Sequence, residues 1–178
     1  MAKQQKILVV DDTPENIQIL VETLKDDYQV VAATNGYKAL QLAVKIPLPD
    51  IILLDVMMPG IDGYEVCARL KSDTNTRNIP VIFITALAEA GDEAKGLGLG
   101  AVDYMTKPIN PSLLKARVHN QLELKKHRDN LQELVEKESI QVHFLTNCNL
   151  FFLISHKLLN QDYYQKIDYI LQILLIFQ

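Results

Sequence analysis

The residues best suited to chemistry in this sequence stand where short apolar runs end. Asp11 and Asp12 follow the first run and Asp55 follows the third. Thr85 closes the fourth run, and Lys107 comes soon after the fifth. Three carboxylates at one place repel one another and raise one another's pKa unless a cation lies among them. A hard divalent ion with oxygen ligands suits such a group, and Mg²⁺ suits it best.

A hydroxyl and an ammonium beside this acidic group indicate a second ligand besides the metal. Thr85, Lys107 and Mg²⁺ could each bind one equatorial oxygen of a phosphoryl group. The group that attacks the phosphorus would then be a carboxylate able to form a covalent aspartyl-phosphate. The residue types therefore predict phosphoryl transfer to an aspartate.

Taken singly, the same residues have ordinary structural explanations. The Asp11–Asp12 pair more often caps the start of a helix, and Asp55 precedes a Met-Met-Pro-Gly turn. Thr85 alone would usually be a cap, and Lys107 alone would be a solvated surface lysine. Only their joint placement at successive strand ends favours a functional site.

Alternating strand-like and helix-like segments must position these residues. The five apolar runs are residues 7–10, 28–32, 51–54, 81–84 and 101–105. Three of them are continuously apolar, as expected of strands buried on both faces of a parallel sheet. Thr13-Pro14 begins the first helix, and apolar stripes mark the faces of the helices that pack on the sheet, the fourth being Ala90, Ala94 and Leu97. This alternation predicts an open α/β sheet with functional groups at the carboxyl ends of its strands.

Four runs of the sequence together resemble the signature blocks of the response-regulator receiver domain. They are ILVVDDTPE at residues 7–15, DIILLDVMMPGIDG at 50–63, PVIFITA at 80–86 and GAVDYMTKP at 100–108. The blocks occur in order, with family-like spacing, over residues 5–122. The resemblance implies a (βα)5 doubly wound, flavodoxin-like fold with strand order 2-1-3-4-5. A long helical extension would follow it.

The resemblance also implies the roles of the acidic residues. Asp55 would be the phosphorylated residue, with a histidine kinase or a phosphotransfer protein as the donor. Asp12 and Asp55 would bind Mg²⁺ directly, Asp11 would bind it through water, and the backbone carbonyl of Met57 would complete the protein's ligands.

Further positions match the phosphate-binding and switch residues of the family. Thr85 and Lys107 would contact the phosphoryl group and assist its transfer to Asp55. Tyr104 matches the aromatic switch position, which couples to the Thr85 hydroxyl. The family also implies a cis peptide bond between Lys107 and Pro108.

Two further positions in the family line the path of the water that hydrolyses the aspartyl-phosphate. They are the residues two beyond the phosphorylated aspartate and two beyond the threonine, here Met57 and Leu87. Neither side chain can orient water. The sequence therefore predicts slow self-dephosphorylation and a long-lived phosphorylated form.

The sequence divides into three regions. Residues 1–122 would form the receiver domain, and residues 123–138 a charged helical linker or coiled-coil extension of the fifth helix. Residues 139–178 contain no Ala, Gly, Pro, Glu or Arg and are rich in Ile, Leu and Phe. This tail is either a helical hairpin that packs on a partner or dimerises, or a frameshifted or truncated output region, in which a shifted reading frame would favour these residue types. No motif of an enzymatic output domain is present.

Composition excludes several other classes of protein. The 178-residue chain is 48% hydrophobic and 22% charged, with a net charge of −4, which gives nucleic-acid binding no electrostatic support. Two cysteines, Cys67 and Cys148, are too few for a disulfide scaffold or a zinc site. Without a signal peptide or an apolar stretch of about 18 residues, no membrane span is expected, and the cytoplasm is the expected location.

The favoured function is a two-component response regulator that is not itself an enzyme. Its output would be docking of a partner or a homodimer, formed through the face of the fourth helix, fifth strand and fifth helix or through residues 111–138. One alternative is a haloacid-dehalogenase-like phosphatase, but that family has a second Asp two residues after its nucleophile, where this chain has Thr13 after Asp11. Further alternatives are a phosphate-independent pseudo-receiver scaffold and a non-functional truncated regulator.

Overall fold

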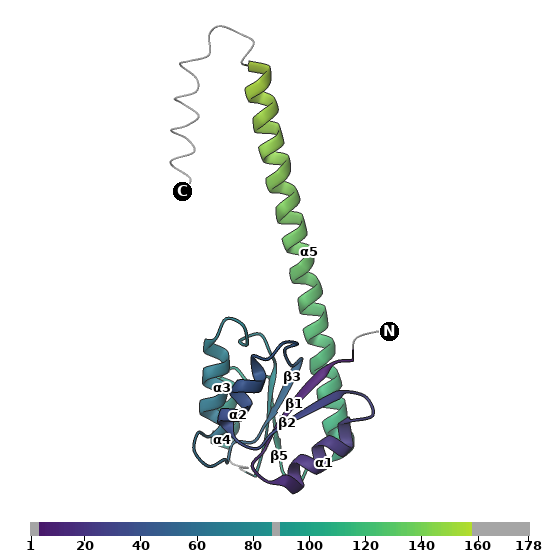
Figure 1. The fold of residues 1–178 in the computed structure, drawn as a ribbon, viewed down its shortest axis with the longest axis vertical. Coiled ribbons are helices and arrows are strands. Elements are labelled where there is room, and N and C mark those ends of the chain that lie inside the picture. The colour runs from purple at the N-terminus through teal and green to yellow at the C-terminus, as the bar shows by residue number, and fades with distance from the viewer. Residues whose placement is uncertain (1–3, 87–89, 158–178) are drawn as a thin grey trace. The chain divides into compact units, whose positions relative to one another are not determined.

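The computed structural model describes residues 4–86 and 90–157 of the chain (Figure 1). The chain divides into two compact units, and the boundary between them falls after Arg128. The site residues predicted from the sequence all belong to the first unit, except that Leu87 lies outside the described residues.

A five-stranded parallel sheet forms the centre of the first unit, and its strand order is β2-β1-β3-β4-β5. The strands are β1 (Lys6–Val10), β2 (Gln29–Ala33), β3 (Ile51–Leu54), β4 (Val81–Thr85) and β5 (Asp103–Thr106). This order confirms the flavodoxin-like topology predicted from the sequence. β1, β3 and β4 are buried along their whole length, which explains why residues 7–10, 51–54 and 81–84 are continuously apolar. β2 lies at an edge, where Gln29 is exposed.

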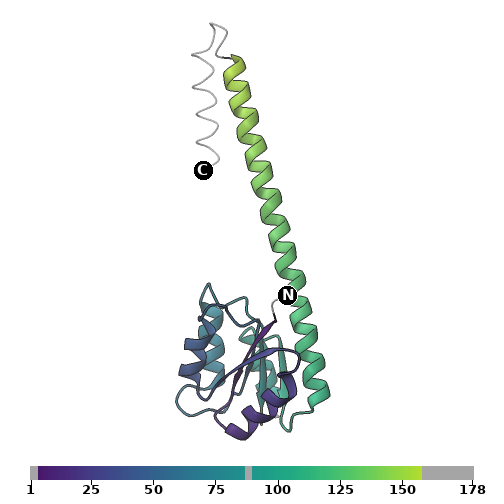
Figure 2. The same cartoon turned by 45° about the vertical axis from the view of Figure 1, so that its right-hand side comes forward.

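Helices cover both faces of the sheet (Figures 1 and 2). They are α1 (Pro14–Leu24), α2 (Gly36–Ala43), α3 (Gly63–Ser72), α4 (Ala90–Gly98) and α5 (Pro111–Lys157). Ile7 and Val9 of β1 pack in one apolar cluster with residues of α1 and α5. Leu8 and Val10 pack in a second cluster with residues of α2 and α3. Successive side chains of the strand therefore serve opposite layers of the core.

Local sequence signals set the starts of the helices. Thr13 precedes α1 in an extended conformation and Pro14 takes the first helical position, as predicted, although the Thr13 side chain makes no capping hydrogen bond. Asn35 caps α2 by accepting from the backbone N–H of Lys38 at 2.9 Å. Asp62 caps α3 in the same way, accepting from Glu65 N–H at 2.7 Å.

Helix α4 differs from the sequence prediction. The stripe of Ala90, Ala94 and Leu97 was expected to face the sheet, but Ala94 is exposed and 43% of Leu97 is exposed. Gly96 takes the contact position instead, because a Cβ there would lie 2.9 Å from the ring of Phe83 and 3.3 Å from that of Tyr104. The two rings lie directly beneath the helix at residue 96, so a side chain larger than that of glycine does not fit there unless the rings move.

Helix α5 begins in the core and continues beyond it. Its buried residues in the first unit are Leu114, Val118 and Leu122. After these the apolar positions are exposed, namely Leu124, Leu131, Leu134 and Val135. The long helix after the (βα)5 unit is confirmed. The predicted boundaries at residues 122 and 138 stay predictions, and residues 158–178 of the predicted tail lie outside the described residues.

Polar contacts hold α5 to the first unit beyond its last buried residue. Lys125 Nζ lies 3.4 Å from Asp50 Oδ1, and Arg128 donates a hydrogen bond of 2.7 Å to the backbone carbonyl of Asn78. Among the helices the structure describes, none is both long and apolar enough to cross a membrane.

Replacing Gly63 should damage the first unit more than replacing a surface glycine. A Cβ at residue 63 would lie 2.1 Å from the backbone oxygen of Asp55 and 2.8 Å from the Cα of Val56. Because both are backbone atoms, rotation of a side chain cannot relieve the clash. We expect Gly63→Ala to lower the free energy of unfolding in urea by more than about 2 kcal/mol.

Gly98→Ala is the control, since nothing lies within 4 Å of a Cβ at that position. It should change the free energy of unfolding by less than about 0.5 kcal/mol, as is usual at exposed sites. Equal effects of the two substitutions would contradict the close approach at residue 63.

Candidate functional site

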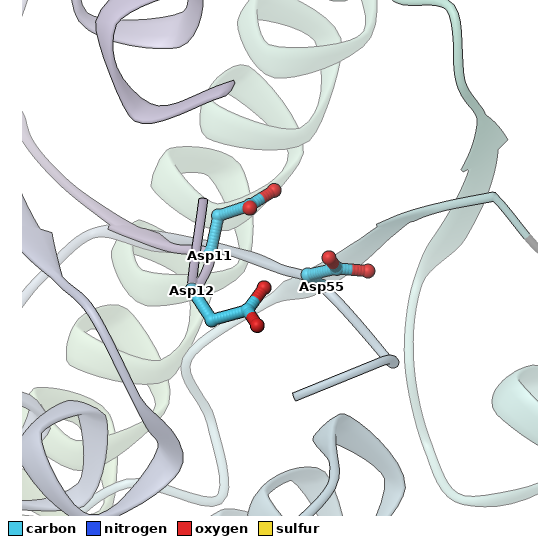
Figure 3. Close-up of side chains that lie close together, drawn as sticks. All are labelled: Asp11, Asp12 and Asp55. Atoms are coloured by element: carbon cyan, nitrogen blue, oxygen red, sulfur yellow. The ribbon is translucent and has the colours of Figure 1, made fainter. Parts of the chain in front are cut away.

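Three carboxylates meet at the carboxyl ends of β1 and β3 (Figure 3). The strands pair in register, Val10 opposite Leu54, so Asp11 and Asp55 leave them side by side. Each of Asp11, Asp12 and Asp55 offers a carboxylate oxygen, and these atoms all lie within 4.8 Å of one another. Asp11 and Asp55 are buried, and Asp12 is half-buried.

Lys107 neutralises part of this acidic cluster. Its Nζ lies 2.7 Å from Asp11 Oδ2 and 2.7 Å from Asp55 Oδ2. The backbone extends the pairing of β4 and β5 to this residue, because Lys107 N–H donates to the carbonyl of Thr85 at 2.8 Å. The Lys107–Pro108 bond is cis, as the resemblance implied. One ammonium therefore joins residues that are 96 and 52 positions away in the sequence.

The second oxygen of each buried carboxylate is held by nearby groups. Asp11 Oδ1 accepts from Thr13 N–H and from the Asn16 side chain, each at 3.0 Å. Asp55 Oδ1 accepts from Met57 N–H at 3.2 Å. Asn16 was not predicted to be a site residue. Its position in the first turn of α1, close after Asp11, was the one signal in the sequence.

The charge of the site favours a divalent cation. Three carboxylates and one ammonium leave a formal excess of two negative charges on largely buried groups. Such an excess is costly unless a cation balances it. The ligand atoms are all carboxylate oxygens, which are the donors preferred by hard cations. Asp11, Asp12 and Asp55 could therefore hold a metal ion.

The pKa of Lys107 reflects two opposing effects. Burial lowers the pKa of the ammonium, but hydrogen bonds to Asp11 and Asp55 and their charges outweigh burial and raise the pKa above its ordinary value. Lys107 therefore stays charged throughout the neutral range.

Thr85 and Tyr104 lie on the two strands beside the cluster. Thr85 is the last residue of β4 and is fully buried. Tyr104 lies on β5 with 7% of its surface exposed, and its ring centroid is 6.2 Å from that of Phe83. Burial, followed by the neighbouring Tyr64, raises the pKa of the Tyr104 hydroxyl far above its ordinary value. Tyr104 therefore remains a neutral hydrogen-bonding group.

Met57 follows Asp55 closely but turns its side chain outward, with 58% of it exposed. The proposed role of its carbonyl as a metal ligand stays a prediction. The segment that begins with Val56 and Met57 borders a surface pocket of about 570 Å³, which is also lined by Tyr64, Asp92 and Lys95. The residues that directly follow Asp55 in the chain thus line an open pocket.

Comparison with known families identifies the fold and its class. Residues 7–119 match the family described as "Response regulator receiver domain". The chain belongs to this family, which confirms the resemblance based on the four sequence blocks, and it is therefore a receiver domain of the two-component response-regulator class.

Relatives show how widely this domain is used. The response regulator PleD of Caulobacter vibrioides is 49% identical over 129 residues, which cover 72% of this chain and 28% of PleD. A Vibrio cholerae protein named "Probable cyclic di-GMP phosphodiesterase" is 41% identical over 141 residues, covering 78% of this chain and 32% of that protein. This chain thus spans a third or less of the length of both relatives.

A solved structure agrees with the fold. It is described as a BeF3-activated DrrB receiver domain, with 35% identity and a TM-score of 0.62. The match covers 68% of this chain and 99% of the solved chain.

Removing the Lys107 ammonium should destabilise the metal-free protein. Lys107→Met leaves two buried carboxylates close together without their counter-charge, so we expect a loss of about 2–4 kcal/mol in unfolding free energy in the presence of a chelator. Because the pKa of Lys107 is raised, its contribution is present below the unfolded pKa and is lost as pH rises through the folded pKa. The loss should therefore be constant between about pH 6 and 9 and shrink above about pH 10.5.

Lys115→Met is the matched control, because Lys115 pairs with Asp27 on the exposed surface. It should leave unfolding almost unchanged. Millimolar Mg²⁺ should restore part of the stability of Lys107→Met by supplying the missing positive charge. A Lys107→Met protein as stable as the wild type in chelator would contradict this account of the site.

Proposed function

We propose that Asp55 accepts a phosphoryl group from the phosphohistidine of a histidine kinase or a phosphotransfer protein. The observation that supports this most is the buried Asp55 carboxylate, with Lys107 Nζ 2.7 Å from one oxygen and Asp11 and Asp12 beside it. A nucleophile, a fixed ammonium and a set of metal-binding oxygens are the parts that phosphoryl transfer needs. The chain would act as a regulated phosphoacceptor in the cytoplasm.

The transfer would be a direct displacement at phosphorus. An Asp55 carboxylate oxygen forms the new bond to phosphorus while the bond from phosphorus to the donor imidazole nitrogen breaks. The electron pair of that bond stays on the nitrogen, and the imidazole leaves as the neutral base once it holds a proton. Lys107, already in contact with Asp55, would bind one oxygen of the transferred group, and the Thr85 hydroxyl would donate to another.

The metal in this proposal is Mg²⁺. Asp12, Asp55 and the Met57 carbonyl would hold it directly, and Asp11 would hold it through water. When bound there, Mg²⁺ would neutralise charge that develops on the phosphoryl oxygens. The oxygen-only donor set and the excess negative charge of the cluster support this choice over softer metals.

The proposed output is a homodimer formed through the face of α4, β5 and α5. Large apolar side chains are exposed on or beside all three elements, namely Leu97 at 43%, Val102 at 38% and Leu113 at 47%. Phosphorylation would reorganise this face and so change the contact between two copies. Residues 111–138 are the second candidate for the dimer contact, supported by the exposed Leu124 and Leu131.

Intact mass measurement tests the acceptor. We expect acetyl phosphate with Mg²⁺ to add one phosphoryl group to the wild type, with acetate as the leaving group, and none to Asp55→Asn. Asp26→Asn is the matched control, because Asp26 is an exposed aspartate after α1 and should leave the uptake unchanged. Equal uptake by the wild type and Asp55→Asn would refute the assignment.

The lifetime of the phosphorylated form tests the role of Met57. An asparagine can orient the attacking water where Met57 cannot. Met57→Asn should therefore shorten the half-life of the phosphorylated form by roughly tenfold, which is a small fraction of the rate gain that positioning of reactants can give. The decay is followed by intact mass after removal of the donor. An unchanged half-life would show that this position does not limit hydrolysis. Leu87, the other predicted position, lies outside the described residues.

A further inference from the structure

Asn16 holds one oxygen of the buried Asp11 carboxylate. Its side-chain amide donates to Asp11 Oδ1 at 3.0 Å, and the backbone N–H of Thr13 donates to the same oxygen at 3.0 Å. On the other side, Lys107 Nζ lies 2.7 Å from Asp11 Oδ2. Only 1% of Asp11 is exposed. Both oxygens of Asp11 are therefore engaged, and a rotation of this carboxylate would break at least one of the three contacts.

The start of α1 brings Asn16 within reach of Asp11. Thr13 precedes the helix, Pro14 is its first residue and Asn16 its third. Side chains in a helix lean towards its N-terminus, so a residue in the first turn can reach the chain that precedes the helix. An amide at this place can donate a hydrogen bond to Asp11 without adding charge to an acidic site.

The other two carboxylates of the cluster are held by fewer or longer hydrogen bonds. Asp55 Oδ1 accepts one hydrogen bond, from the backbone N–H of Met57 at 3.2 Å. Asp12 is half-buried, and its Oδ1 lies 3.4 Å from the Thr13 hydroxyl, the one hydrogen bond that its carboxylate makes within the described residues. Asp12 and Asp55 can therefore turn an oxygen towards a metal ion at a lower cost than Asp11 can.

We propose that Asn16 is a positioning residue that sets which divalent ion the acidic cluster prefers. By holding Asp11 Oδ1, it keeps Asp11 out of direct contact with the metal, which then has two carboxylates as direct ligands and keeps bound waters. Such a site suits Mg²⁺, which loses its waters reluctantly, whereas Ca²⁺ takes roughly 6–8 oxygen ligands in a flexible geometry. This inference rests on the proposed Mg²⁺ site beside Asp55 and adds a reason for its preference.

The neutral charge of the amide makes the inference testable. Replacing Asn16 by an apolar residue leaves the formal charge of the cluster unchanged. Two ions of equal charge respond almost equally to a change in the electrostatic field of the site. The ratio of the Mg²⁺ and Ca²⁺ dissociation constants changes markedly only if the number or geometry of the ligands changes. This ratio therefore separates positioning of Asp11 from a general effect on charge or stability.

Asn16→Ala is the variant that tests this role. The dissociation constants of MgCl₂ and CaCl₂ follow from urea unfolding of the unphosphorylated protein at several metal concentrations and constant ionic strength. We expect Asn16→Ala to strengthen Ca²⁺ binding relative to Mg²⁺ binding by roughly fivefold, the factor that one hydrogen bond of ordinary net strength supplies. Gln18→Ala is the matched control, because Gln18 is an exposed amide on the same helix, and it should leave the ratio unchanged.

A double-mutant comparison tests whether Asn16 acts through Asp11. Asp11→Asn removes the carboxylate that Asn16 holds. Adding Asn16→Ala to Asp11→Asn should therefore have little further effect on the ratio of the two dissociation constants.

Other outcomes separate the inference from the function on which it rests. If Asn16→Ala leaves the ratio as in the wild type, whether or not both dissociation constants change, the inference alone is overturned. A change in the ratio that persists in the Asp11→Asn background overturns the proposed route through Asp11. Failure of Mg²⁺ to stabilise the wild type overturns the proposed metal site, and the inference with it.

Discussion

The ammonium of Lys107 between two buried carboxylates is the interaction on which the site depends. Parallel strands that end at one edge bring Asp11 and Asp55 together, and two such charges with little water around them repel strongly. Lys107 offsets that repulsion and at the same time ties β5 to β1 and β3. The ion pairs of Lys107 therefore stabilise this edge of the sheet and also position the groups of the site.

Asp55 and Tyr104 are both buried, but the helices that approach them differ in how much side-chain surface they bury. The start of α3 approaches the Asp55 backbone so closely that only glycine fits at residue 63. Near Tyr104, by contrast, α4 lies on two aromatic rings with Gly96, while Ala94 is exposed and Leu97 is 43% exposed. The molecule thus combines a fixed reaction centre with a helix that is lightly held, an arrangement that suits a switch.

The extent to which sequence predicted this structure follows from the physics of each element. β1, β3 and β4 were recognisable because burial on both faces requires continuous apolar sequence, and Asp11, Asp12 and Asp55 could be grouped because parallel strands share an edge. The stripe on α4 misled because helical periodicity does not reveal how large the residues beneath a helix are.

Individual contacts between side chains could not be predicted from the sequence. Asn16 supports Asp11, and Tyr64 donates a hydrogen bond to Asp92 of α4, only because of the directions in which their side chains point in the folded chain. No spacing rule in the sequence encodes such directions. The contacts that Lys125 and Arg128 of α5 make with Asp50 and the Asn78 carbonyl could not be predicted, because in the sequence these residues are only charges on a long helix.

The exposure of Leu97 on α4 has a thermodynamic consequence for the binding of any partner. A partner that covers Leu97 adds apolar burial at a side chain that is 43% exposed, and so favours one position of α4 over another. Linkage is reciprocal: if phosphorylation favours the position that binds the partner, the bound partner must favour phosphorylation by the same factor. The receiver would then report the presence of its target back to its donor.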